Sequence, residues 1–288
     1  MDKLKLSYSG ASTFRSCRKK YYWRYIKGFY PVIPSLALSL GKILHEGFDA
    51  FYKGAGDREV YKLIETAFDK EMSKQEVTDQ ENILINKYTA LGMWANYPHK
   101  DLSEYTEVHS EEAFEIPLCD GVVFVGKVDG RILQYSNYWV RELKTTGLSK
   151  RQFEGRAKVS NQGTGYVYGL KQKGYDIKGI MYEYIKKQIL RKGMTESVDM
   201  YGRRIIADYR NRPKFYYHRH LSYRTPIDMD NFKEDMTGVA KDILNCLSYY
   251  RNTDSCWNFN SECPYAKICF TEKPDPLTLE LYYTRRDK

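Results

Sequence analysis

The stretch Gly126-Lys-Val-Asp129-Gly-Arg-Ile-Leu-Gln-Tyr-Ser-Asn-Tyr-Trp-Val-Arg-Glu142-Leu-Lys144 reads as two strands joined by a tight turn. β-Branched and aromatic residues fill it, as is typical of strands, and Ser136-Asn137 is its local turn signal. If these two residues form the loop, Asp129 pairs with Lys144, and Glu142 points to the same face as Lys144. Asp129 and Glu142 then become diagonal neighbours, roughly 7–8 Å apart at the backbone and within reach of one cation.

Two carboxylates and a lysine on one face of a largely apolar hairpin are costly to bury without a partner. A divalent metal ion would satisfy both carboxylates. A surface ion pair between Lys144 and either Asp129 or Glu142 explains the same residues, because charged side chains on half-buried strands are common. The hairpin alone leaves both interpretations open.

Gly-x-x-Asp followed by Glu-x-Lys resembles the PD-(D/E)XK nuclease superfamily and, more specifically, its RecB-like branch. That branch also carries an upstream Gly-x-x-x-His and a downstream Gln-x-x-x-Tyr. Gly41-Lys-Ile-Leu-His45 and Gln162-Gly-Thr-Gly-Tyr166 stand in those places, in that order. Each piece alone is weak, but four in order are strong, and the resemblance extends from about Ser7 to Phe270.

The resemblance implies a metal-dependent DNA nuclease, an exonuclease of recombination or repair that leaves 5′-phosphates. Lys144 would orient and activate the attacking water, and Gln162 and Tyr166, which share a helix face, would line the site and touch either the DNA or Lys144. Carboxylate oxygens suit Mg²⁺, and an imidazole makes Mn²⁺ a plausible activator. The implied ligands of Mg²⁺ or Mn²⁺ are Asp129, Glu142, His45 and the backbone carbonyl of Leu143.

The expected fold is α/β, with a mixed central sheet flanked by helices as in a restriction-endonuclease-like core. We expect one nuclease domain over 1–288 with a helical insertion over 57–100. Glu112 is a further carboxylate candidate for the metal face, with Glu111 and Glu115 as competitors. The expected helices cover 7–28, 36–53, 160–173 and 228–250, with two more within 57–97. Ser9 or Ser12 is the expected N-cap of the first, and Ser160 is that of the helix over 160–173. The expected strands are 105–117, 121–129, the hairpin, 178–187 and 214–223, the last two flanking a basic loop with Arg203, Arg204, Arg210 and Arg212.

Charge is unevenly distributed along the chain, whose net charge is +9. Residues 186–224 hold eleven Lys or Arg against three Asp or Glu, whereas residues 57–112 hold six against thirteen. This asymmetry favours nucleic acid as the partner, with DNA expected and RNA left open. Near the start of the chain, basic residues alternate with aromatic ones. This mixture suits binding of a phosphate backbone with base stacking, and it suits equally a half-buried helix with solvated charges. The basic residues are Arg15, Arg18, Lys19, Lys20, Arg24 and Lys27, and the aromatic ones are Tyr21, Tyr22, Trp23 and Tyr25.

The composition, 29% charged and 42% hydrophobic over 288 residues, is that of a globular protein with room for a sizeable core. No run approaches the ~18 apolar residues of a membrane span, and the first residues show no secretory signal, so a cytoplasmic protein of a bacterial or phage-infected cell is expected, without a membrane partner. No nucleotide-binding Gly-x-x-x-x-Gly-Lys-Ser/Thr occurs. A separate helicase or recombination partner is therefore conceivable, and the oligomeric state stays open.

Three of the six cysteines, Cys256, Cys263 and Cys269, lie within fourteen residues of the tail, and Cys17 makes a set of four. Four thiolates suit zinc or a [4Fe–4S] cluster, although paired Cys-x-x-Cys knuckles typical of zinc modules are lacking. One N-terminal and three C-terminal cysteines resemble the iron–sulfur nucleases of the RecB-like branch, such as the AddB nuclease domain and the CRISPR-adaptation exonucleases. Those nucleases usually have two residues between the first two cysteines of the tail, whereas this chain has six between Cys256 and Cys263. The resemblance implies a cluster-binding segment over 254–271 that joins both chain ends. The remaining two, Cys119 and Cys246, are expected in the core.

Two other function classes remain at this stage. A recombination-accessory module would bind DNA with the same fold but without cutting it, although it would not need the complete set of Asp129, Glu142 and Lys144. A zinc-stabilised adaptor without nuclease activity would use the four cysteines alone, and metal analysis would separate it from an iron–sulfur protein.

Overall fold

The computed structural model describes residues 3–33, 35–73, 80–258, 261–271 and 273–286. The chain divides into two compact units. Unit 1 comprises Met1–Pro34, Glu115–Gly126 and Pro226–Lys288, and unit 2 comprises Ser35–Phe114 and Lys127–Thr225. The two long strands β3 (Glu107–Cys119) and β4 (Val122–Gln134) each begin in one unit and end in the other.

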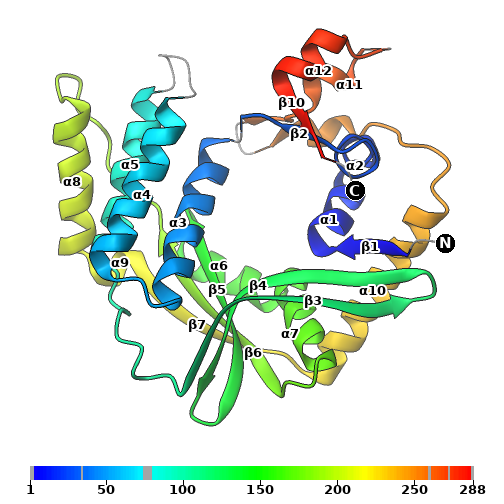
Figure 1. Cartoon of the computed structure of the whole chain (residues 1–288), viewed down its shortest axis with the longest axis horizontal. Helices are drawn as coiled ribbons and strands as arrows, with labels where there is room; N and C mark the ends of the chain where they lie inside the picture. Colours follow the sequence, from blue (N-terminus) through cyan, green and yellow to red (C-terminus); the bar gives the residue numbers. More distant parts are fainter. Residues whose placement is uncertain (1–2, 34, 74–79, 259–260, 272, 287–288) are drawn as a thin grey trace. The chain divides into compact units, whose positions relative to one another are not determined.

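The central sheet has the strand order β1-β4-β5-β6-β7, with β3 paired to β4 (Figure 1). In unit 1, β1 (Leu4–Ser7) pairs in parallel with the start of β4. In unit 2, β5 runs antiparallel to β4 and parallel to β6, and β7 runs antiparallel to β6. Parallel and antiparallel pairs with helices alongside confirm the mixed α/β fold. The strands of the central sheet that lie wholly in unit 2 are β5 (Asn137–Thr146), β6 (Ile177–Lys186) and β7 (Tyr217–Tyr223).

Four helices of unit 2 lie side by side in the order α3, α4, α5, α8 (Figure 1). Their buried residues share one hydrophobic cluster with Leu143 of β5 and Ile185 of β6. The two helices expected within 57–97 are thus built into the core of unit 2. The helix bounds are α3 (Leu36–Tyr52), α4 (Asp57–Met72), α5 (Gln80–Ala95), α6 (Lys150–Lys158), α7 (Asn161–Gln172), α8 (Val198–Asn211) and α9 (Pro213–Tyr216).

The prediction of a basic loop between β6 and β7 is wrong, because most of this segment forms helix α8. Ser197 caps this helix by accepting a hydrogen bond from the backbone N–H of Met200. Tyr201, Ile205 and Tyr209 follow at intervals of four residues and are buried. This stripe provides the apolar face that a helix needs, and the arginines between its members had concealed it.

After β1, unit 1 continues with a helical segment that is interrupted at Cys17. Ser7, rather than Ser9 or Ser12, caps it, accepting from the N–H of Gly10. Cys17 adopts extended backbone angles and divides the segment, which Gly28 ends with a φ of +71°. Its parts are α1 (Tyr8–Ser16), α2 (Arg18–Tyr21) and the π-helical turn η1 (Tyr22–Ile26).

The remainder of unit 1 is the long helix α10 (Pro226–Leu244) and the C-terminal tail. Strand β2 (Phe29–Pro31) pairs antiparallel with β10 (Tyr283–Arg285), so sequence-distant ends of the chain lie together in this unit. The short tail elements are η3 (Thr253–Ser255), β8 (Trp257–Asn258), β9 (Ser261–Glu262), α11 (Ala266–Cys269) and α12 (Pro276–Tyr282). A search of the described residues finds no helix with the length and apolar character that crossing a bilayer requires.

Candidate active site

The β4–β5 hairpin has a different register from the expected one. Its loop is Tyr135-Ser136, and Gln134 pairs with Asn137. Both loop residues have positive φ, 48° and 60°, as in the type I′ turn that suits a two-residue hairpin. Since Gly130 pairs with Arg141, one further step places Asp129 opposite Glu142, not opposite Lys144. The observed register places the carboxylates of Asp129 and Glu142 closer together than the expected diagonal arrangement would.

Asp129 is held by the strand and helix beside it. Its Oδ2 accepts a hydrogen bond of 2.9 Å from the backbone N–H of Leu143, and its Oδ1 lies 3.2 Å from Nδ1 of His45. His45 reaches it from α3, which begins with Ser35 as N-cap. The structure therefore brings together the His45 and Asp129 that the sequence motifs place 84 residues apart.

Lys144 lies on the same strand as Glu142 and is held from two sides. Its Nζ is 2.5 Å from Oε1 of Glu142 and donates to Oε1 of Gln162 at 3.4 Å. Gln162 in turn donates from Nε2 to the hydroxyl of Tyr166 at 2.9 Å. Helix α7 thus connects both of its predicted site residues to the lysine.

Burial and charge shift the pKa values of these groups in different directions. Burial, followed by the charge of Asp129, raises the pKa of Glu142 to about 7. Burial also acts to raise the pKa of Asp129, but the hydrogen bond and charge of His45 together with Arg141 hold it below its usual value. Burial acts to lower the pKa of Lys144, but the adjoining Glu142 raises it, so the amine is protonated at neutral pH.

One buried atom in this site lacks a partner. Oε2 of Glu142 makes no hydrogen bond, although the residue is only 3% exposed. An unsatisfied buried carboxylate oxygen is costly, and a hard cation would satisfy it. Asp129, Glu142, His45 and the Leu143 carbonyl are donors of the kinds that Mg²⁺ and Mn²⁺ accept. Among the described residues, however, no three His, Cys, Asp or Glu side chains are already gathered as a metal-ion site.

Of the three glutamates that compete for the metal face, Glu111 lies in the same small cavity as His45 and Asp129. It has a φ of +45° and pairs with Lys127 at 2.7 Å. Glu112 instead pairs with Arg131 and Lys173, and Glu115 pairs with Lys5. The preference for Glu112 is therefore not supported by its contacts.

Behind the site lies a buried ion network that the sequence reasoning missed. Arg141 is 1% exposed, donates from Nη2 to the backbone oxygen of Asp129 at 3.1 Å, and lies over the ring of Tyr52 at 3.6 Å. Its Nη1 is 3.6 Å from Oε2 of Glu183, whose other oxygen accepts from Arg219 at 2.8 Å. The available signal was a charged residue in the middle of each of two apolar strands.

The four cysteines of the predicted cluster all belong to unit 1 and are free thiols. Burial, with the neighbouring Cys17, Cys263 and Cys256, raises the pKa of Cys269, so the four lie near enough to interact electrostatically. No group of three among the described cysteines is assembled as a metal site. The expected four-thiolate ligand set is therefore not formed in the structure.

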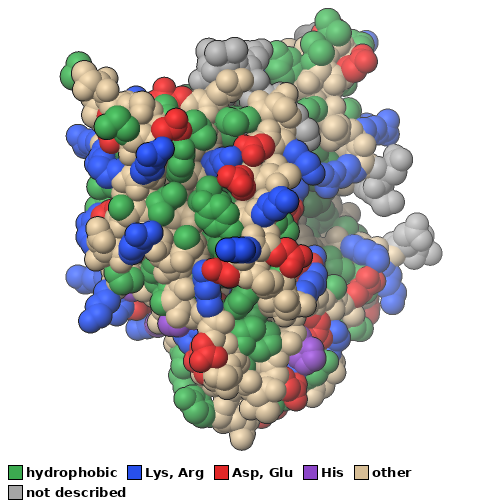
Figure 2. Space-filling model, turned by 60° about the vertical axis from the view of Figure 1, so that its left-hand side comes forward, with side chains coloured by type: hydrophobic (Ala, Val, Ile, Leu, Met, Phe, Trp, Pro, Cys, Tyr) green, Lys and Arg blue, Asp and Glu red, His purple; other side chains and the backbone are tan. Residues whose placement is uncertain are grey.

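Part of the charge asymmetry of unit 2 is compensated by ion pairs within that unit. Arg204 and Arg212 pair with nearby carboxylates on or beside α8, and Lys192 and Arg219 pair with Glu81 and Glu104 of the acidic segment. Figure 2, which turns the α8 side of the structure forward, shows Lys and Arg side chains interspersed with Asp and Glu. These four pairs neutralise part of the positive surplus of residues 186–224.

Comparison with known proteins gives a family match over most of the chain. The family described as the PD-(D/E)XK nuclease superfamily matches residues 5–270. No curated protein matches the chain. A solved structure described as "Crystal structure of SSO0001" is 16% identical in sequence to this chain, with a TM-score of 0.33. The match covers 76% of this chain and 89% of the chain in that structure.

Proposed function

Because the chain belongs to the PD-(D/E)XK nuclease superfamily, we propose that it is a metal-dependent DNA nuclease whose site is formed by Asp129, Glu142, Lys144 and His45. The observation that carries this proposal is the buried Glu142, whose Oε2 has no partner while its Oε1 holds Lys144. A structural ion pair alone would have no need for the second carboxylate, Asp129, on the adjacent strand. A cation between the two carboxylates accounts for both.

We place the chain in the RecB-like branch and assign it an exonuclease activity that leaves 5′-phosphates during recombination or repair. The support is the contact of His45 with Asp129 and the link from Lys144 through Gln162 to Tyr166. These pairs join the two outlying motifs to the central one. A separate helicase or recombination protein would supply any unwinding of duplex DNA.

In this mechanism Asp129, Glu142, His45 and the carbonyl of Leu143 would hold Mg²⁺ or Mn²⁺. The bound ion would lower the pKa of a coordinated water and polarise a phosphoryl oxygen. The Leu143 N–H fixes the carboxylate of Asp129, so this ligand is oriented before metal arrives. Protonated Lys144, held by Glu142 and Gln162, orients the attacking water and stabilises the charge that develops on the phosphate.

We also propose that a [4Fe–4S] cluster binds Cys17, Cys256, Cys263 and Cys269 and draws them into a ligand group. The support is their common location in unit 1 and their mutual electrostatic interaction. Backbone contacts already bring the segments together, since Asn252 N–H lies 3.4 Å from Sγ of Cys17 and the Cys263 N–H donates to the Cys256 oxygen at 2.7 Å. No step of the hydrolysis depends on this cluster.

The test is cleavage of labelled linear and closed circular DNA with Mg²⁺ or Mn²⁺, using protein purified without oxygen. Lys144→Ala should lower the rate by about 10²–10³-fold or more while DNA binding persists, because the lost contact stabilises charge in the transition state. Glu142→Ala should also weaken metal binding, measured by Mn²⁺ titration. The matched control is Lys178→Ala, which removes a lysine of β6 that pairs with Asp176.

Cleavage of linear DNA alone would support an exonuclease, and cleavage of circles would assign the same chemistry to an endonuclease. Normal cutting by both Lys144→Ala and Glu142→Ala would refute the site. DNA binding by an intact wild-type protein that never cuts would instead favour the accessory-module function.

A further inference from the structure

The segment Arg15–Lys27 in unit 1, named here the cationic segment, carries positive charges that form no ion pair with the described acidic residues. Six Lys or Arg residues lie in it, and the sequence has no Asp or Glu between Asp2 and Glu46. Within the described part of the chain, none of the six forms an ion pair, whereas three arginines of unit 2, Arg204, Arg212 and Arg219, each pair with a carboxylate. The six residues are Arg15, Arg18, Lys19, Lys20, Arg24 and Lys27.

Aromatic rings, not carboxylates, hold these cations. The guanidinium of Arg18 lies 5.1 Å from the ring centre of Phe14 and 4.9 Å from that of Tyr250. Lys19 Nζ lies 4.9 Å from the ring of Tyr22. A ring attracts a cation through its quadrupole but carries no net charge, so the positive potential of the segment persists. Cations oriented in this way remain available to an anion.

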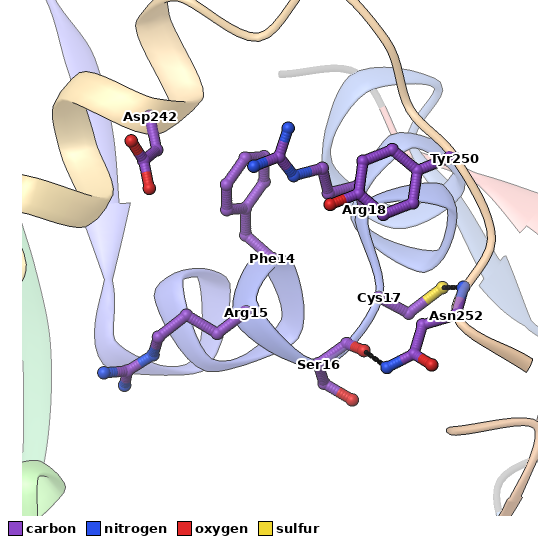
Figure 3. A pocket seen from close by; sticks show the side chains of 8 residues that line it. All are labelled: Phe14, Arg15, Ser16, Cys17, Arg18, Asp242, Tyr250 and Asn252. Carbon is purple, nitrogen blue, oxygen red and sulfur yellow. Dashed lines mark hydrogen bonds between the residues drawn. The ribbon is translucent and has the colours of Figure 1, made fainter. Parts of the chain in front are cut away.

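A cavity of about 180 Å³ opens beside the segment, within unit 1 (Figure 3). Arg15 and Arg18 contribute two positive charges to its lining, against one carboxylate, that of Asp242. Asn252 fixes one wall, because its Nδ2 donates to the Ser16 backbone oxygen at 2.9 Å. The remaining lining residues are Phe14, Ser16, Cys17 and Tyr250.

Exposed aromatic side chains lie on the tail that supplies Tyr250 to this cavity. Tyr250 is 58% exposed, Trp257 is 65% exposed and Phe270 is 56% exposed, all on the tail of unit 1. Phe270 also lies under the guanidinium of Arg251, at 5.1 Å from its ring centre. Exposed rings beside unneutralised cations are the combination with which proteins bind single strands, because bases stack on the rings while phosphates meet the cations.

We propose that the cationic segment and its cavity bind a single strand of DNA, with a phosphate at Arg15 and Arg18 and a base on the exposed ring of Tyr250. The inference rests on the proposed function for the identity of the strand, which is the substrate of the nuclease. It adds a binding surface in unit 1 to the cutting site in unit 2. Sequence-independent affinity then comes from phosphate charge and stacking.

The test is fluorescence anisotropy of a labelled oligothymidylate in metal-free buffer at several salt concentrations, with the Lys144→Ala protein as background. The double substitution Arg15→Ala/Arg18→Ala should weaken binding about tenfold and make the slope of log affinity against log salt shallower by about 1.4, the value for two phosphate contacts with a single strand. Asp242→Asn should tighten binding about twofold, because it removes the one carboxylate in the cavity. A gain in affinity cannot come from misfolding.

The matched control is Arg203→Ala/Arg210→Ala, which removes two exposed arginines of α8 in unit 2. An equal loss of affinity in this control would show general charge attraction and overturn the proposal, as would unchanged binding in Arg15→Ala/Arg18→Ala. Preference for a duplex of the same length, or competition by polyglutamate as effective as by DNA, would also contradict it. Failure of the proposed nuclease function is separate, because it would appear as absent cutting by wild type, whatever the binding of the variants.

Discussion

Glu183 is a carboxylate that stays charged although it is 1% exposed. Burial acts to raise its pKa, but the guanidinium groups of Arg141 and Arg219 lower it below the ordinary value of 4.5. Its hydrogen bonds to Tyr52 and Arg219 satisfy both oxygens, so the charge is compensated within the core of unit 2. Because Arg141 also donates to the backbone of Asp129, this network supports the strand that carries Asp129.

We predict that Glu183→Gln lowers the free energy of unfolding by about 3–5 kcal/mol at pH 7, since it removes the carboxylate that pairs with the buried Arg141 and one of the two carboxylates that pair with Arg219. A depressed pKa in the folded state contributes stability that is complete above pH 4.5 and is lost as pH falls through the folded value. The difference between wild type and variant should therefore shrink below pH 4.5. Urea unfolding at a series of pH values measures it.

Glu115→Gln is the matched control for this substitution. Glu115 pairs with Lys5 through side chains that are 50% and 66% exposed, so its loss should change the free energy of unfolding by less than about 1 kcal/mol. A difference between wild type and Glu183→Gln that does not change between pH 7 and pH 3 would contradict a charged Glu183 in the folded protein.

Chemistry-bearing residues were the part of the site that the sequence could predict. Asp129, Glu142, Lys144 and His45 stand in spaced motifs, and the structure brings them together in unit 2. Arg141 could not be assigned in the same way, because a lone charged residue in a strand gives no indication of its partner. Glu183 follows it by 42 positions and becomes its neighbour only through the parallel pairing of β5 and β6.

At the scale of single elements, helix α7 is governed by its glycines. A Cβ at Gly169 would lie 2.5 Å from the ring of Phe114, and one at Gly163 would meet Tyr182 and Ile180 of β6. The absence of a side chain at these two positions therefore permits the close packing of α7. The close approach matters for the site, because α7 carries Gln162 and Tyr166 toward Lys144.

We predict that Gly169→Ala destabilises the protein by about 1–3 kcal/mol, because the extra methyl group must displace a buried ring. Gly155→Ala in helix α6 is the matched control, since a Cβ there meets nothing within 4 Å. That change should instead stabilise by about 0.4–1 kcal/mol, through the reduced entropy of the unfolded chain. Thermal and urea unfolding of both variants would decide, and equal effects of the same sign would refute the packing argument.

The hairpin illustrates why registers are harder to predict than elements. Composition correctly indicates two strands, but the turn depends on two residues with positive φ, and Tyr135 gives no such signal. Taking Ser136-Asn137 as the loop shifts the pairing of Asp129 from Glu142 to Lys144. Helix α8 was missed for a similar reason, because local arginines outweighed a buried stripe whose packing partner is the distant helix α5.

At the scale of the whole chain, the two units divide the proposed tasks. Unit 2 contains the proposed cutting site, and its Lys192, Arg204 and Arg219 each pair with an acidic residue of the same unit. Unit 1 contains the cationic segment and all four cysteines of the proposed cluster. Charge counts along the sequence could not distinguish these cases, because they do not tell which cations meet a carboxylate in the folded chain.

The chain ends in unit 1 are joined by contacts that need no metal. Tyr265 donates from its hydroxyl to the Phe29 oxygen at 2.8 Å, and Trp23, Tyr265, Ile268 and Tyr283 form a small hydrophobic cluster. A cluster of this size contributes little by itself. Binding energy from an iron–sulfur group would therefore become a large part of the stability of unit 1.

We predict that wild type purified without oxygen contains about four iron atoms per chain and absorbs visible light. Cys263→Ser should lose both and lower Tm by roughly 5–10 °C, because it removes a group that stabilises only the folded chain. Cys119→Ser, which changes a cysteine of the same unit outside the set of four, should retain the iron and the colour. One zinc per chain without visible absorbance would replace the cluster by a four-thiolate zinc site, and wild type without any bound metal would contradict both. The absence of iron and zinc would not affect Lys144-dependent cutting of DNA with added Mg²⁺ or Mn²⁺, since the residues of the proposed hydrolytic site all belong to unit 2.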